Sequence, residues 1–148
     1  MGTREGLNRF ASAFAELAII GQIVAEASID VQKSYLESVY EEYLDRRNFL
    51  IDGLNKIPGV YSPIPMGAFY TVAKLPVDDA EKFCIWCLRD FQYEGATVMM
   101  APASGFYTEP GEGRQEVRIA YVLNKDDLAK ALTCLAKALE KYNSLEKK

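Results

Sequence analysis

Arg118 is the residue whose type and setting point most directly to chemistry. It lies within Glu116–Val122, a short strand-like run that otherwise reads as buried. Alternation places the side chains at 117, 119 and 121 on one face and those at 118, 120 and 122 on the other. An unpaired buried charge costs at least several kcal/mol, so a guanidinium there requires an anionic partner. The ordinary alternative is an edge-strand arginine that pairs with Asp or Glu or is solvated.

A second pattern with chemical potential is the C-x-x-C spacing of Cys84 and Cys87. This spacing occurs in redox and metal sites, but here it falls in the middle of a predicted helix, in phase with Phe83 and Leu88. A redox pair belongs at a helix N-terminus, where the helix dipole lowers the thiol pKa. A zinc site needs further soft ligands, and Cys134 is the only other cysteine. We therefore expect these cysteines to pack in the core and predict no metal site.

The order of segments around Arg118 carries a resemblance to a known family. Pro65-Met66-Gly67-Ala68-Phe69-Tyr70 opens one predicted strand, a Gly-rich loop spans 105–113, and Val117-Arg118-Ile119-Ala120 follows. Over about residues 14 to 143 the chain resembles the small, C-terminal domain of a class I/II, fold-type-I, pyridoxal-phosphate-dependent aminotransferase of the aspartate aminotransferase kind. The pairing of the two motifs at this distance is more specific than either motif alone.

The resemblance implies a role for Arg118 and a cofactor. In that family the matching arginine binds the α-carboxylate of the substrate. The resemblance also places the strand start, with Phe69 and Tyr70, near the substrate side chain. Because these two residues alternate along one strand, we expect one in the core and the other toward the ligand. Pyridoxal 5'-phosphate would be bound by a large domain that this chain has no room to contain.

The lysines do not supply the Schiff-base residue of such an enzyme. Most of them lie on helical patterns beside other charges, as solvated side chains do, and none has the strand-to-loop setting of a cofactor lysine. We therefore predict no catalytic and no cofactor-binding residue in this chain, and no activity of the chain alone. The resemblance implies amino acid and 2-oxo acid substrates, a large domain in the same polypeptide and a homodimer at full length.

Bulk properties exclude several classes of function. The chain has 148 residues, 49% of them hydrophobic, and a net charge of −4. The acidic balance argues against nucleic acid or an anionic membrane as partner. No apolar run approaches the roughly 20 residues that span a bilayer. An odd count of three cysteines suggests a reducing, cytoplasmic setting. The absence of histidine removes Ser-His-Asp and Cys-His catalysis.

The pattern of breakers and periodicity predicts the elements that position these residues. Helices are expected over about 7–27, 31–57, 77–91 and 125–142, and strands over 68–74, 97–100 and 116–122. The helix over 31–57 is expected to begin after an Asp30 N-cap and to bury a stripe of side chains from Leu36 to Ile57. The helix over 125–142 is expected to begin after an Asn124 N-cap.

These elements predict an α/β (α+β) fold of two layers, with helices on one side of a small mixed sheet and a long N-terminal linking helix. We expect residues 1–29 to form a helix that adjoins the absent large domain. Residues 30–143 would be the small domain, and 144–148 a frayed tail.

Three functional interpretations remain open. The leading one is an aminotransferase small domain that supplies the carboxylate-binding arginine and a closing lid. A lyase or decarboxylase with the same fold and cofactor would use the same carboxylate contact. The third is a free-standing α/β module that binds small carboxylates without catalysis. The sequence does not identify the amino acid.

Overall fold

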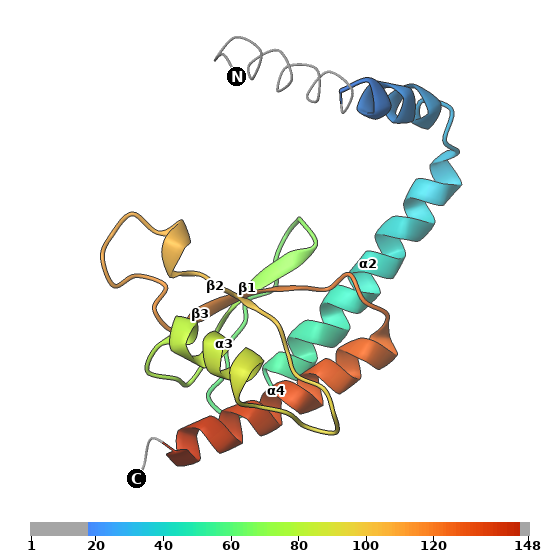
Figure 1. Cartoon of the computed structure of the whole chain (residues 1–148). Coiled ribbons are helices and arrows are strands. Elements are labelled where there is room, and N and C mark those ends of the chain that lie inside the picture. Colours follow the sequence, from blue (N-terminus) through green and yellow to red (C-terminus); the bar gives the residue numbers. More distant parts are fainter. Residues whose placement is uncertain (1–17, 146–148) are drawn as a thin grey trace, which may run out of the picture. The chain divides into compact units, whose positions relative to one another are not determined.

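The computed structural model describes residues 18–145 (Figure 1). The chain divides into two compact units, Met1–Tyr40 and Glu41–Lys148. In the first unit, residues 18–28 are helical, and the earlier part of the helix predicted over 7–27 lies outside the described residues. This helix exposes four large apolar side chains, Ile19, Ile20, Ile23 and Val24. None of the helices within 18–145 has the length and apolarity needed to cross a membrane.

Helix α2 (Lys33–Leu54) begins later than the sequence predicted. The amides of Tyr35 and Leu36 both bond the carbonyl of Gln32, so the helix starts after Gln32 and the Asp30 N-cap is wrong. The predicted buried stripe is also only partly formed. Leu50 and Leu54 are buried near the C-terminal end of α2, whereas the side chains toward its start, Leu36 included, are exposed because nothing in the described residues covers them.

The second unit is built on a three-stranded antiparallel sheet with strand order β1-β3-β2. Its strands are β1 (Tyr70–Lys74), β2 (Ala101–Pro102) and β3 (Glu116–Ala120). β3 lies between the other two, so its neighbours on both sides restrict its backbone. The predicted strand over 97–100 is wrong: pairing begins at Ala101, opposite Arg118. Pro102 has no N–H to donate, and it sits on an edge strand where none is required.

Helices α3 (Ala80–Arg89) and α4 (Lys125–Leu145) complete this unit with the end of α2. The Asp79 side chain caps α3 by accepting from the amides of Glu81 and Lys82. Asn124 caps α4 as predicted, because its side-chain oxygen accepts from the Asp127 amide at 2.9 Å. In Figure 1 the C-terminal end of α2 lies against α4.

One face of the sheet packs on these helices and the other is open. The helix-facing side includes Ala73, Val117 and Tyr121, which are 0%, 0% and 2% exposed. The other face carries Tyr70, Arg118 and Ala120, all exposed. The alternation predicted for β3 is therefore confirmed, as is the two-layer α/β fold class.

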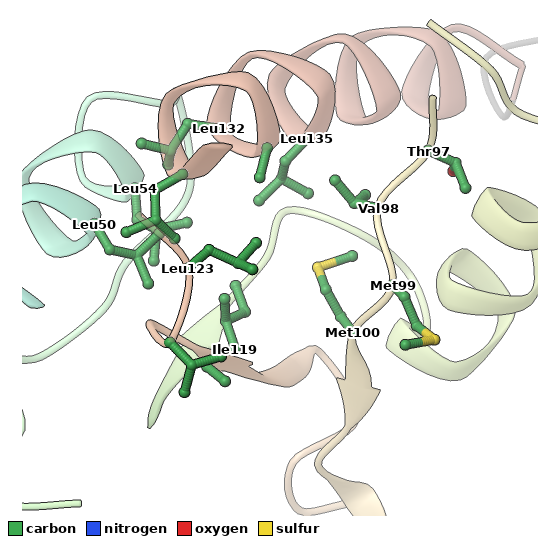
Figure 2. A pocket seen from close by; sticks show the side chains of 14 residues that line it. Leu50, Leu54, Thr97, Val98, Met99, Met100, Ile119, Leu123, Leu132 and Leu135 are labelled. Carbon is green, nitrogen blue, oxygen red and sulfur yellow. The ribbon is translucent and has the colours of Figure 1, made fainter. Parts of the chain in front are cut away.

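An apolar cavity of about 390 Å³ lies on the helix-facing side of the sheet (Figure 2). Leucines of α2 and α4 line it together with Ile119 and the segment 97–100. Figure 2 shows Leu132 of α4 beside Leu54 of α2 at one end of the cavity and Met100 toward the other. The cavity is partly open to solvent, since its lining residue Leu123 is 49% exposed, and it leaves room for side chains at the junction of α2 and α4 to move.

The two cysteines of the C-x-x-C pattern are buried in α3, so the prediction of core packing is confirmed. Burial raises the pKa of the Cys84 thiol to about 11 and that of Cys87 to about 12. Both thiols are therefore protonated at neutral pH, which makes them poor nucleophiles.

Candidate carboxylate-binding site

Arg118 projects from the central strand onto the open face of the sheet. Its partners across the two ladders are Val72 on β1 and Ala101 on β2, both small enough to leave the guanidinium space above the strands. Because β3 is central, the edge-strand interpretation of Arg118 is wrong. The backbone beneath this side chain is fixed on both sides.

Two aromatic rings lie beside the Arg118 guanidinium. Its central carbon, Cζ, is 5.2 Å from the ring centroid of Tyr70 and 5.3 Å from that of Phe106. Both distances fall within the ~6 Å over which a cation is attracted to the face of an aromatic ring. Tyr70 belongs to β1, and Phe106 to the short 3-10 helix η1 (Ser104–Phe106) that follows β2.

Within residues 18–145, no carboxylate pairs with Arg118. Every ion pair in this range involves other cations. Glu116 lies on the same face of β3, two residues earlier, but its Oε2 accepts a hydrogen bond from the Tyr107 hydroxyl at 2.5 Å. That hydrogen bond raises the pKa of Tyr107 above its ordinary value. The Arg118 charge thus faces aromatic rings and solvent.

The structure places Phe69 and Tyr70 differently from the prediction that one of them is in the core. Phe69 is 55% exposed and Tyr70 is 37% exposed. Phe69 precedes β1 rather than lying in it, and its ring meets Tyr70 edge-on at 5.7 Å. The strand alternation therefore does not extend to Phe69, and only Tyr70 contacts Arg118.

A left-handed backbone turn at Ala68 comes directly before Phe69 and β1. Ala68 has a φ of 61°, a conformation that costs a residue with a Cβ about 1–2 kcal/mol. The buried Tyr121 hydroxyl donates to the Ala68 carbonyl at 2.9 Å, and the Tyr121 amide donates to the Phe69 carbonyl at 2.9 Å. Arg47 of α2 donates to the Pro65 carbonyl at 3.2 Å. These bonds fix the chain as it enters β1.

Phe106 is the functional candidate that the sequence did not reveal. It lies in the Gly-rich loop over 105–113, where the sequence predicted no functional residue. Its approach to Arg118 depends on the pairing of β2 with β3, which is not a local feature. The sequence signal that could have pointed to Phe106 is an aromatic residue within a loop of glycines and polar residues.

The lysines that form ion pairs within residues 18–145 lie at the surface. Five of them, including Lys82 and Lys125, have side chains that are at least 49% exposed, unlike the buried setting of a cofactor lysine. Within 18–145 there is no group of three or more His, Cys, Asp or Glu side chains suited to a metal. Among residues 18–145, Arg118 is the candidate for binding an anion, because it is exposed beside two rings and no acid in this range pairs with it.

The sequence is similar to aspartate aminotransferase of Pyrococcus horikoshii, with 32% identity over 131 residues. This match spans 87% of the chain and 30% of the relative. The solved aspartate aminotransferase of Rhizobium meliloti matches with a TM-score of 0.64 and 27% identity, over 82% of this chain and 31% of that one. The chain is homologous to part of an aspartate aminotransferase.

The fold agrees with this homology. LysN, the α-aminoadipate aminotransferase of Thermus thermophilus solved with N-(5'-phosphopyridoxyl)-L-leucine, matches with a TM-score of 0.67 over 82% of this chain and 31% of LysN. At 22% identity that match shows a shared aminotransferase fold only. No protein-family model matches the sequence. The chain spans about 30% of the length of its aminotransferase relatives, consistent with a C-terminal small domain.

Proposed function

We propose that this chain is the small domain of a pyridoxal-phosphate-dependent aminotransferase and that Arg118 binds the substrate α-carboxylate. The observation that carries the proposal is the setting of Arg118. Its guanidinium lies on the open face of a central strand, beside two rings and unpaired with any acid of residues 18–145. A guanidinium kept free of protein carboxylates is available to a carboxylate that arrives from solution.

The chemistry of Arg118 follows from the shape of its side chain. A guanidinium presents parallel N–H groups in one plane, which match the two oxygens of a carboxylate. Two such bonds fix both the position and the rotation of the bound carboxylate, and thereby the bonds at the adjacent Cα. A lysine ammonium supplies the charge without the planar fork, so it would hold the substrate in a less defined orientation.

The open sheet face suits a lid that excludes water. Tyr70 and Phe106 lie beside the Arg118 charge with exposed apolar surface, and the exposed Phe69 ring meets Tyr70 edge-on. When a second surface closes on this face, water leaves and the arginine–carboxylate contact strengthens in the drier environment. The exposed apolar side chains of the helix over 18–28 also provide surface for a large domain.

The remaining components belong to the rest of the proposed enzyme. A large domain would bind pyridoxal phosphate, which supplies the electron sink for amino-group transfer between an amino acid and a 2-oxo acid. We propose that the whole protein is a homodimer and that the chain alone is inactive. The three buried free thiols fit a reducing, cytoplasmic setting.

The test replaces Arg118 with lysine in the complete protein that contains this chain. The expected loss in kcat/KM for amino acids corresponds to roughly 2–4 kcal/mol of transition-state stabilisation, about 30- to 1,000-fold. Arg114→Lys is the matched control, because Arg114 is also exposed but pairs with Asp79 at 3.4 Å, away from the open face. Wild-type kcat/KM for Arg118→Lys would show that Arg118 does not bind substrate. Absence of amino-group transfer by the wild-type protein to 2-oxoglutarate, oxaloacetate and pyruvate alike would contradict aminotransferase chemistry.

A further inference from the structure

We propose that Tyr70 and Phe106 are positioning residues that orient the Arg118 guanidinium while leaving its N–H edge free for the substrate. The proposal rests on the proposed role of Arg118 and assigns that role two supporting side chains. Neither ring needs to touch the substrate for this effect.

The two rings approach Arg118 from opposite sides of its strand. β3 lies between β1, which carries Tyr70, and β2, which leads into η1 and Phe106. The guanidinium carbon is 5.2 Å and 5.3 Å from the two ring centroids. A long arginine side chain on an open surface has many rotamers, and attraction to two ring faces reduces that freedom before substrate binds.

Aromatic neighbours orient a cation in a way that acidic neighbours cannot. A protein carboxylate would occupy the same N–H groups that the substrate carboxylate needs, whereas a ring face attracts the cation through its π electrons. Glu116 is the acid on the same face of β3, and its Oε2 accepts from Tyr107 at 2.5 Å instead. Arg118 is therefore held by groups that do not compete with an anionic ligand.

The backbone near each ring is held to β3. Tyr70 lies opposite Ala120 in the register of β1 on β3, and the carbonyl of the preceding residue, Phe69, accepts from the Tyr121 amide at 2.9 Å. The Phe106 amide donates to the Ala103 carbonyl at 2.9 Å, and the Ala103 amide donates to the Glu116 carbonyl at 2.9 Å. The loop that carries Phe106 is thus tied to the same strand as Arg118. Phe106 itself is 66% exposed, so its replacement should not disturb the core.

The test follows the side-chain Nε–Hε signal of Arg118 by NMR in the 148-residue chain, with acetate as the carboxylate probe. Loss of the signal in Arg118→Lys assigns it. In Phe106→Leu the signal should move downfield as ring shielding is lost, and the acetate dissociation constant should rise roughly two- to five-fold. Tyr70→Leu should behave in the same way, whereas Tyr70→Phe, which keeps the ring, should match the wild type.

Phe49→Leu is the control for replacing an exposed aromatic ring with leucine at a position away from Arg118. Phe49 lies on α2, is 36% exposed and makes no ring contact with a cation in the described residues. An unchanged Arg118 signal and acetate affinity in Phe106→Leu and Tyr70→Leu would overturn the positioning role. If Arg118→Lys still weakened acetate binding in that case, the carboxylate-binding role would stand. Unchanged acetate binding in Arg118→Lys would instead overturn the proposed function and the positioning role with it.

Discussion

Replacing Tyr121 with phenylalanine tests whether the Tyr121 hydroxyl stabilises the turn that precedes β1. The Tyr121 side chain is 2% exposed, and its hydroxyl donates to the Ala68 carbonyl at 2.9 Å. A hydrogen bond of this kind contributes about 0.5–1.5 kcal/mol net. Water can reach the exposed Ala68 once the hydroxyl is gone, which argues against the larger penalty of a buried unpaired carbonyl. The ring still fills its site, so we expect a loss of about 1 kcal/mol.

Urea unfolding followed by fluorescence measures this loss. Trp86 is the single tryptophan, and it packs against Phe91 and Tyr142 at ring distances of 5.2 and 5.3 Å. With a urea m-value of ~1–2 kcal/mol/M, the midpoint should fall by about 0.5–1 M. Tyr61→Phe is the matched control, because Tyr61 is 63% exposed and its hydroxyl makes no hydrogen bond within residues 18–145. Equal midpoints for the two variants would refute the assigned role of the Tyr121 hydroxyl.

Two further predictions concern the core. Gly53→Ala should stabilise the chain by about 0.5 kcal/mol, because helix propensity favours alanine by up to ~1 kcal/mol. A new Cβ would meet both methyl carbons and Cγ of Leu132, and this side chain can shift into the 390 Å³ cavity. Thermal unfolding checks this, and a lower midpoint would mean that Leu132 cannot move. The raised pKa values of Cys84 and Cys87, about 11 and 12, favour the protonated thiols in the folded state. Their contribution is complete below the unfolded thiol pKa and is lost as pH rises from about 9 toward 12. The urea midpoint should therefore fall over that range, less steeply in a Cys84→Ala/Cys87→Ala variant, and equal slopes would contradict the assignment.

The sequence predicted those parts of the fold that local patterns determine. The alternation around Arg118 and the Asn124 cap depend on residues within a few positions, and both are present. The second strand was misplaced because Ala101 pairs with Arg118 across a long separation, and its own composition does not indicate this. The first strand was predicted from residue 68 but begins at Tyr70, because Ala68 has a left-handed backbone, where glycine would be the expected residue.

The candidate site likewise combines a feature that the local sequence predicted with contacts that depend on distant parts of the chain. Arg118 could be identified from its charge in an apolar strand and from the family resemblance. Its contact with Tyr70 requires the register of β1 on β3, and its contact with Phe106 requires the path of the loop after β2. Residue types alone were enough to identify Arg118 as a candidate. The orientation of its guanidinium depends on nonlocal strand pairing, which one sequence does not specify.

The placement of Arg118 between two core residues limits how this region can change in evolution. Val117 is fully buried and Ile119 lines the cavity, so the hydrophobic core sets which face each residue of β3 occupies. A one-residue insertion or deletion within β3 would reverse these faces and carry the guanidinium toward the core. Related proteins that keep the proposed carboxylate site should therefore vary in length between the strands, while β3 itself changes only by substitution.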